Sequence, residues 1–325
     1  MPGIIAASAW PALAADSRMP AAANRLHRIG VLGPDTTDAQ GPLWDAFVEE
    51  LARRGHVEGR NLLFVRRYAA DGRAEPLDAL AAEIVAAQVD VIYATRGSAS
   101  ALAAKRATST IPIVFFSSAD PVGMGLVASL ARPGGNLTGS AALSYDLTTK
   151  AVELLSEATG GVRRFAFFLQ AGQRRLPWIQ KLEATLAEAA ARFGARVHFV
   201  EVTAAHEIDR LVRGLRGQGC DSAIVYDFAV IQPHLQRIAT LCIEQRLPAY
   251  GWAHWGFLLH YSEPRWEMAR TAARLVDRIL RGAKPAELPV EQVSTFDLTL
   301  NLKTARALGL TLPRALLARA NEVIE

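Results

Sequence analysis

The stretch Asp90-Val91-Ile92-Tyr93-Ala94-Thr95-Arg96-Gly97-Ser98-Ala99-Ser100 decides the fold of this chain. Its first half is a short apolar run, typical of a buried parallel strand, and its second half begins an alanine-rich segment with helical spacing. At such a junction the first backbone N–H groups of the helix lack partners inside the helix, and a glycine lets a ligand come close. The stretch therefore predicts a strand leading into a helix. The start of that helix either holds an anion such as a carboxylate beside Gly97, with a hydroxyl from Ser98 or Ser100, or is empty, as in many α/β proteins.

The same alternation extends to both sides of this stretch. Apolar runs predict strands at residues 28–32, 62–65 and 111–116, and 3.6-residue spacing predicts helices at 41–55, 77–87 and 98–108. Strands that alternate with helices in this way are typical of a parallel sheet with helices on both faces.

The segment Arg132-Pro133-Gly134-Gly135-Asn136-Leu137-Thr138-Gly139 interrupts the alternation. It is dense in turn-forming residues, so we interpret it as a boundary and not as the interior of a helix or strand. A second series follows it, with a helix at 147–158, strands at 164–169, 196–202, 222–226 and 248–252, and helices at 178–193, 206–217 and 233–245.

The two series share one order and spacing. Residues 89–93, a helix and residues 110–114 match residues 220–224, a helix and residues 246–250, which predicts a duplicated domain. We therefore expect an α/β fold of two similar parallel-sheet, Rossmann-like lobes, with the carboxyl ends of both sets of strands facing a shared cleft.

The last section is too small to be a third domain. It predicts a strand near 256–262, a helix at 266–281 and a strand at 293–300, which we interpret as chain that passes between the lobes, giving a hinge of three segments. The expected first lobe comprises residues 25–140 and about 258–288, and the expected second lobe comprises residues 141–257 and about 289–325.

Composition excludes some classes of partner. The net charge is +4 and the pI is near 9.3, but the arginines are scattered singly and in pairs without interleaved aromatic residues. This pattern favours solvated surfaces over a nucleic-acid interface, and no helix-turn-helix segment precedes Arg28.

Residues 1–24 are interpreted as the back part of an export signal. The apolar run at residues 4–10 is followed by Ala12-Leu13-Ala14, which fits the pattern before a signal-peptidase cut, although a basic segment in front of it is missing. The alternative is an unstructured alanine-rich tail. An export signal predicts a periplasmic protein, and no other apolar segment is long enough to span a membrane.

Patterns typical of catalysis and metal binding are missing from the sequence. It holds no G-x-S-x-G, H-E-x-x-H or G-x-x-x-x-G-K-[ST], and none of its seven histidines pairs with another at ligand spacing. Residues 123–128 match G-x-G-x-x-[GA], but they do not follow the first strand directly, which favours close helix packing over dinucleotide binding. We expect no enzyme, no cofactor and no metal, and favour two buried free thiols over a disulfide for Cys220 and Cys242.

Polar and aromatic residues that follow the predicted strands make up the candidate ligand site. Asp120 either receives a ligand ammonium or caps the following helix, and Asp227 has the same two interpretations. Trp252 and Trp255 either pack in the core or stack on a flat ligand. The full candidate set is Asp35, Thr36, Thr95, Gly97, Ser98, Ala99, Ser117, Asp120, Tyr226, Asp227, Trp252 and Trp255.

Several motifs resemble one known family. They are Arg28-Ile-Gly-Val-Leu32, Ser118-Ala-Asp-Pro-Val122, the run from Gly125 to Gly139, Ile279-Leu-Arg-Gly-Ala-Lys-Pro285 and Leu300-Asn-Leu-Lys-Thr-Ala-Arg-Ala-Leu-Gly-Leu310. Over residues 28–325 the chain resembles the ABC-transporter substrate-binding proteins related to tryptophan-binding lipoproteins.

The resemblance implies a type I periplasmic-binding fold. It also implies a monomer that delivers a small ligand, amino-acid-like or an aromatic or apolar carboxylate, to an ABC permease with its ATPase. The matching site positions are Gly97, Ser98, Ala99 and Asp120 in the first lobe and Asp227 in the second. A ligand sensor that partners a membrane receptor is the alternative, and an α/β enzyme is less favoured.

The chain departs from the family pattern on the expected cleft side. Residues 171–175 replace the usual Asn-Pro pair, and residues 255–262 replace the usual Gly-Gly-Leu-Met-Ser-Tyr-Gly strand. No lipid-bearing cysteine lies near the start, which favours a free periplasmic protein over an anchored one.

Overall fold

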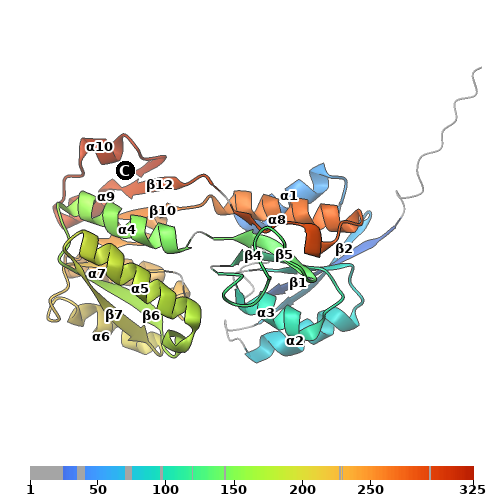
Figure 1. Cartoon of the computed structure of the whole chain (residues 1–325). Coiled ribbons are helices and arrows are strands. Elements are labelled where there is room, and N and C mark those ends of the chain that lie inside the picture. The colour runs from blue at the N-terminus through green and yellow to red at the C-terminus, as the bar shows by residue number, and fades with distance from the viewer. Residues whose placement is uncertain are drawn as a thin grey trace, which may run out of the picture.

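The chain folds into two α/β lobes that lie side by side and are joined by three chain segments (Figure 1). The structure is a computed structural model that describes residues 25–34, 41–69, 75–95, 98–118, 120–142, 144–226, 228, 230–292 and 294–325. Residues 1–24, with the predicted export signal, lie outside these ranges. No helix in the described ranges combines the length and the apolar character needed to cross a bilayer.

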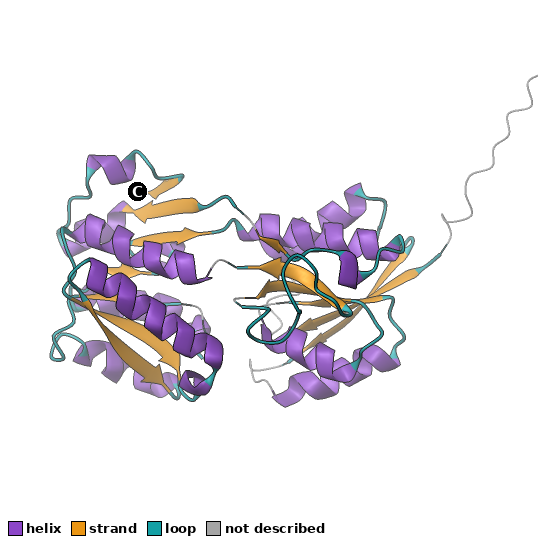
Figure 2. Cartoon of the chain, in the orientation of Figure 1, coloured by secondary structure: helices purple, strands orange, loops and turns teal. Residues whose placement is uncertain are grey.

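The first lobe contains one parallel sheet of six strands in the order β11-β5-β4-β3-β1-β2. The strands are β1 (His27–Gly33), β2 (Leu62–Tyr68), β3 (Val91–Ala94), β4 (Ile113–Ser118), β5 (Leu137–Ala141) and β11 (Glu291–Gln292). Helices cover both faces (Figure 2): α1 (Pro42–Arg53) and α8 (Arg265–Leu280) on one, and α2 (Glu75–Ala86) and α3 (Ser98–Ala107) on the other.

Alternate residues of each strand serve the two cores of this lobe. On β4, Val114 and Phe116 pack on the side of α1 and α8, whereas Ile113 and Phe115 pack on the side of α2 and α3. Because both faces are buried, the strands have the continuous apolar sequences that identified them.

The second lobe contains seven strands in the order β13-β12-β10-β9-β8-β6-β7. They are β6 (Arg164–Gln170), β7 (Arg196–Val202), β8 (Ser222–Ile224), β9 (Ala249–Tyr250), β10 (Leu259–Ser262), β12 (Asp297–Asn301) and β13 (Glu322–Ile324), with β12 antiparallel to β10. One face carries α4 (Ser144–Thr159), α5 (Pro177–Arg192), α9 (Leu302–Leu308) and α10 (Arg314–Leu317), and the other carries α6 (Ile208–Gly214) and α7 (Leu235–Glu244).

The order β2-β1-β3-β4-β5 of the first sheet recurs as β7-β6-β8-β9-β10 in the second. This repetition confirms the predicted duplication and the fold of two parallel-sheet lobes. In both lobes the loops after the central strands lie at the carboxyl edge of the sheet, where open α/β sheets bind ligands.

The three crossings lie after β5, after β10 and after β11. The expected boundaries near residues 258 and 288 are displaced, because β10 pairs with β9 and β12 in the second sheet, and β11 pairs with β5 in the first. The hydrophobic pattern identifies a strand but carries no information on which of two similar sheets it joins.

The prediction that residues 132–139 contain no element interior is wrong at their end, where β5 begins with Leu137. Thr138 Oγ1 donates to the carbonyl of Leu288 at 2.8 Å, and Gly139 lies so close to β4 that a Cβ would come within 2.2 Å of the Phe115 carbonyl oxygen. Glycine allows the two strands to approach closely here. In the sequence, such a glycine looks the same as one that forms a turn.

Two smaller expectations have different outcomes. Residues 121–125 form turns and not a helix, so the prediction of close helix packing at the G-x-G pattern is wrong; Gly125 has φ +67°. Cys220 and Cys242 are free and buried, as favoured, and burial raises the pKa of the Cys242 thiol to about 12.

A charge cluster around the buried Asp277 carboxylate ties α8 to the first lobe. The Asp277 carboxylate accepts hydrogen bonds from Arg281 Nε at 2.7 Å and Arg54 Nη1 at 3.4 Å, and it lies 2.8 Å from His56 Nε2. Burial by itself raises the pKa of Asp277, but the bonds from Arg281 and His56 outweigh it and hold the pKa below its ordinary value.

Asp277→Asn is expected to lower the free energy of unfolding by about 1–3 kcal/mol at pH 7, because the variant loses charge-assisted hydrogen bonds. The depressed pKa means that this contribution is present above pH 3.8, the ordinary value, and is lost as the pH falls through the folded-state pKa. Urea unfolding at several pH values measures both effects. The control is Asp78→Asn, whose exposed pair with Arg106 contributes about 0–1 kcal/mol. Equal losses in the two variants would contradict the prediction.

Candidate functional site

The start of α3 forms the first part of the candidate site. Thr95, at the end of β3, is buried and its Oγ1 donates to the Leu32 carbonyl at 3.3 Å. α3 begins at Ser98, which is half-buried, and Ala99 is exposed. The Ser100 side chain is fully buried, and no hydrogen bond from the described residues reaches its Oγ. The start of α3 thus offers N–H donors close to a buried hydroxyl.

Some predicted site residues cannot be placed. Asp35, Thr36, Gly97 and Asp227 lie outside the described residues, and Ser117 is described only through its backbone, at the end of β4. Their proposed contacts with a ligand stay predictions.

Asp120 contacts both its own lobe and the opposite one. Its Oδ1 accepts from the Gly123 N–H at 2.8 Å, and its Oδ2 accepts from the Tyr145 hydroxyl of α4 at 3.1 Å. The Lys181 Nζ of α5 lies 4.0 Å from the same Oδ2. The carboxylate therefore caps a turn and also bridges the lobes. The sequence predicted either a helix cap or a contact with a ligand ammonium at this position. Its contact with a ligand ammonium stays a prediction.

Tyr145 and Lys181 were missed by the sequence reasoning. The Lys181 ammonium lies 4.4 Å from the centre of the Tyr145 ring. Burial, followed by the nearby Asp120 charge and the hydrogen bond to it, raises the pKa of Tyr145 well above its ordinary value, so its hydroxyl remains a donor. Lys181 is 62% exposed, so its contact with Asp120 is weak.

Aromatic rings form the second-lobe part of the candidate site. The Trp252 ring, just after β9, lies 4.1 Å from the His260 ring of β10 at an angle of 34°, and the Trp255 ring is 6.5 Å away. Trp255 is 39% exposed, whereas Tyr250 is fully buried and donates its hydroxyl to the Tyr261 carbonyl at 2.6 Å. Tyr250 therefore belongs to the core, and Trp252 with Trp255 forms the partly accessible surface.

Tyr226 lies at the carboxyl end of β8, next to the first crossing. Its ring packs edge-on against Phe167 and Tyr250, and its hydroxyl lies 3.0 Å from Thr148 Oγ1 of α4. The residue is half-buried.

Arg265, which the sequence reasoning also missed, is the first residue of α8. Its guanidinium carbon lies 5.7 Å from the ring centre of Phe116 in the first lobe and 5.4 Å from that of Trp252 in the second. Arg265 therefore stands at the second crossing, between the lobes. The sequence feature that could have identified Arg265 is a cation directly after Pro264, at the start of a helix, where acidic residues are usual.

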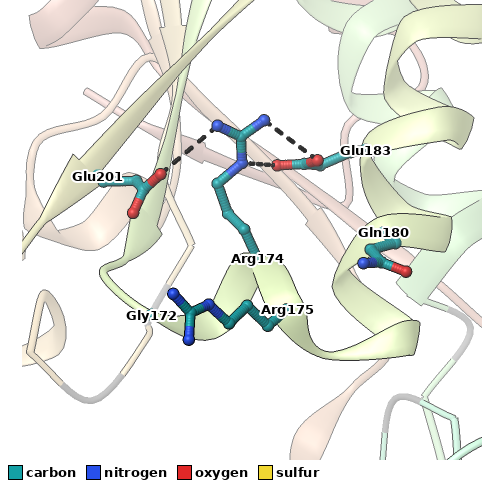
Figure 3. A pocket seen from close by; sticks show the side chains of 6 residues that line it. All are labelled: Gly172, Arg174, Arg175, Gln180, Glu183 and Glu201. Atoms are coloured by element: carbon teal, nitrogen blue, oxygen red, sulfur yellow. Dashed lines mark hydrogen bonds and ion pairs between the residues drawn. The ribbon is translucent and has the colours of Figure 1, made fainter.

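A cavity of about 590 Å³ lies within the second lobe, at the carboxyl ends of β6 and β7 (Figure 3). Arg174 contacts Glu183 and Glu201 across it and lies over the Phe199 ring, whereas the Arg175 side chain turns away from the two glutamates. The remaining lining residues are Gly172 and Gln180. This is the loop in which the sequence lacks the usual Asn-Pro pair.

Buried polar atoms without partners gather at the same end of β6. Among the described residues, no hydrogen bond reaches Gln170 Oε1, Gln173 Oε1 or Trp178 Nε1. Most buried polar groups in proteins are hydrogen-bonded, so these three atoms favour a polar guest or water at this edge of the lobe. The described residues also contain no group of histidine, cysteine, aspartate and glutamate side chains suited to a metal ion.

Comparisons with known proteins agree with this arrangement. A tyrosine-binding protein of Clostridioides difficile is 24% identical over 269 residues, which cover 81% of this chain and 75% of that protein. A conserved domain protein from Vibrio cholerae superposes with a TM-score of 0.83 at 24% identity, covering 92% of this chain and 100% of the other. An ABC domain from Streptococcus pneumoniae, solved in complex with L-Trp, gives 0.80 at 22% identity, covering 92% and 99%.

The model of one protein family, ABC transporter substrate binding protein, matches residues 28–324. This match covers both lobes and all three crossings. The family consists of solute-binding proteins and not of enzymes, in agreement with the prediction from the sequence. The chain belongs to the ABC transporter substrate binding protein family.

Proposed function

We propose that this protein captures a small amino-acid-like or aromatic carboxylate ligand between its lobes and delivers it to an ABC importer. The observation that most supports the proposal is that the carboxyl ends of the two sheets carry unlike groups, and that Asp120 bonds to Tyr145 of the opposite lobe. Donors and a carboxylate come from the first lobe, at α3 and Asp120, and an aromatic surface comes from the second, at Trp252 and His260. The relatives named for tyrosine and solved with L-Trp support this ligand class.

Each part of such a ligand has a proposed partner. Its carboxylate docks at the N–H groups of Ser98 and Ala99, with Gly97 beside them. Its ammonium or hydroxyl meets Asp120 or Asp227, and its apolar body lies on Trp252 or Trp255. The remaining proposed contacts are Asp35, Thr36, Thr95, Ser117 and Tyr226.

The energies require these contacts to act together. Micromolar affinity corresponds to about −8 kcal/mol. A carboxylate at a helix start contributes about 0.3–2 kcal/mol and burial of an aromatic group about 1.5–3 kcal/mol. Several contacts must therefore form at once, which a hinge that closes two lobes on one ligand provides.

The proposed setting is the periplasm. There the protein, a monomer exported by the signal at residues 1–24, docks with a permease that is driven by its ATPase. The family supports a transporter partner and a small-molecule ligand.

A thermal-shift screen tests this function. Amino acids, aromatic acids and purines are each added to the full chain, and a compound at a hundred times its dissociation constant is expected to stabilise the protein by about 2.7 kcal/mol. The proposal expects at least one amino acid or aromatic acid to raise the melting temperature. A screen in which only purines do so, or in which no compound does, would contradict it.

Ser98→Pro is expected to weaken binding of the selected compound about 2- to 30-fold, because it removes one N–H donor at a helix position where proline is tolerated. Isothermal titration measures the change. Ser98→Ala, which keeps the N–H and loses only the hydroxyl, is the matched control. An unchanged affinity in the proline variant would show that the ligand carboxylate does not bind at the start of α3.

A further inference from the structure

We infer that Arg265 is the specificity-determining residue of the cleft and contacts the acidic group of a ligand whose planar body lies against Trp252. The inference rests on the proposed function and deepens it, because it adds a second anion contact, supplied by the hinge, to the one at the start of α3.

The position of Arg265 comes from the chain path. β10 ends at Ser262 in the second sheet, and α8 begins at Arg265 and packs on the first lobe. Only Glu263 and Pro264 lie between them, so Arg265 is held at a crossing. Its guanidinium lies over Phe116 on one side of that crossing and over Trp252 on the other. A ligand that enters between the lobes meets this cation at the hinge.

The position of Phe116 places Arg265 at the same edge of the first sheet as the start of α3. Ala94 of β3 pairs with Phe115 of β4, so Phe116 stands beside the point at which β3 ends and the chain turns toward α3. The anion contact proposed at α3 and the cation at the hinge therefore belong to one end of one sheet.

The chemistry suits an acidic group. Cation–π contacts are made through the face of a guanidinium, whereas hydrogen bonds to an anion are made in its plane. A guanidinium has five such donors, so it binds a carboxylate in bidentate fashion even when another protein group already occupies part of it. The buried carboxylate nearest to Arg265 in the sequence belongs to Glu263, which is 5% exposed.

Helix electrostatics add an independent argument. The start of a helix carries partial positive charge, so a cation in the first position of the 16-residue α8 is disfavoured. Glu267 in the first turn makes its ion pairs with Arg270 and Arg274, further along the helix. Helix stability therefore does not account for an arginine at this position, which favours a role in ligand binding.

Trp252 links this cation to the flat part of the ligand. One ring contacts both the guanidinium and the His260 ring, which lies 4.1 Å away. A planar body on the accessible part of Trp252 places an attached acidic group within reach of Arg265. The proposed ligand is therefore an aromatic or similarly flat acid.

The test compares carboxylates with their neutral amides. Isothermal titration of the full chain with L-tryptophan, L-tryptophanamide, L-tyrosine and L-tyrosinamide gives the preference for the acid. Arg265→Gln is expected to weaken binding of the acid about 10- to 30-fold and to change binding of the amide less than about threefold. Arg265→Lys keeps the charge, so its affinity for the acid is expected to lie between those of the parent and of Arg265→Gln. Arg278→Gln, an exposed arginine near the other end of α8, is the control and should bind like the parent.

Three outcomes would overturn the inference. An Arg265→Gln variant that binds the acids normally has lost no ligand contact. A variant that loses affinity for the acid and the amide equally, with an unchanged melting temperature, has lost shape complementarity to the ligand and not a contact with its anion. A parent protein that binds none of the four compounds while the wider screen finds no other acid removes the proposed function and this inference together. Normal binding by the parent with either of the first two results removes the inference alone.

Discussion

Gly139→Ala is expected to be the most destabilising single-methyl change in the first lobe, lowering the free energy of unfolding by about 3 kcal/mol or more. The new Cβ would lie 2.2 Å from the Phe115 carbonyl oxygen and 2.6 Å from the Phe115 ring. A flexible side chain would move away, but this carbonyl belongs to β4, next to β5 in the sheet, so relief requires the two strands to separate. Urea unfolding followed by circular dichroism measures the loss.

Gly135→Ala is the matched control for this prediction. Gly135 lies in the same glycine-rich segment, a Cβ there would meet no atom within 4 Å, and its φ lies outside the left-handed range. We expect a change within about 0.5 kcal/mol. Equal unfolding midpoints for the two variants would show that β5 does not approach β4 closely enough to exclude a Cβ at residue 139.

Trp252→Ala is expected to weaken binding of an aromatic ligand about 30- to 100-fold, because one ring carries several contacts at once. It packs on His260, lies under the Arg265 guanidinium and provides the proposed surface for the ligand. Titration with the compound selected by the melting screen measures the effect, and Trp252→Phe should recover part of the affinity.

The control for this second prediction is Trp266→Ala. Trp266 is 47% exposed at the start of α8 and is not among the proposed ligand contacts, so the variant removes an equally large ring from the surface. We expect its affinity to match that of the parent. A Trp252→Ala variant that binds as tightly as Trp266→Ala would exclude Trp252 from the ligand surface.

Much of the fold was predictable from sequence because both sheets are buried on both faces. The run Val91-Ile92-Tyr93-Ala94 is apolar throughout, since alternate residues pack on opposite helix layers, and such runs stand out from the amphipathic helices around them. β5 was missed because Gly139 serves a close strand contact, and the sheet that β10 joins was misplaced because its pattern fits either lobe.

The candidate site was predictable only where it follows strands. Asp120, Trp252 and Ser98 come directly after β4, β9 and β3, and strand ends in parallel sheets point to one edge. Tyr145, Lys181 and Arg265 begin or line helices, and their importance depends on what faces them across the crossings. That relation depends on how two separate sheets are placed, which no local spacing encodes.

We propose that the two lobes close on a small acid without altering it. Small-angle X-ray scattering of the full chain, with and without a saturating amount of the selected compound, tests it most directly when the compound is afterwards recovered and identified. We expect a smaller radius of gyration with ligand and a compound recovered unchanged. A scattering curve that stays the same with the compound bound, or recovery of a converted product, would contradict it.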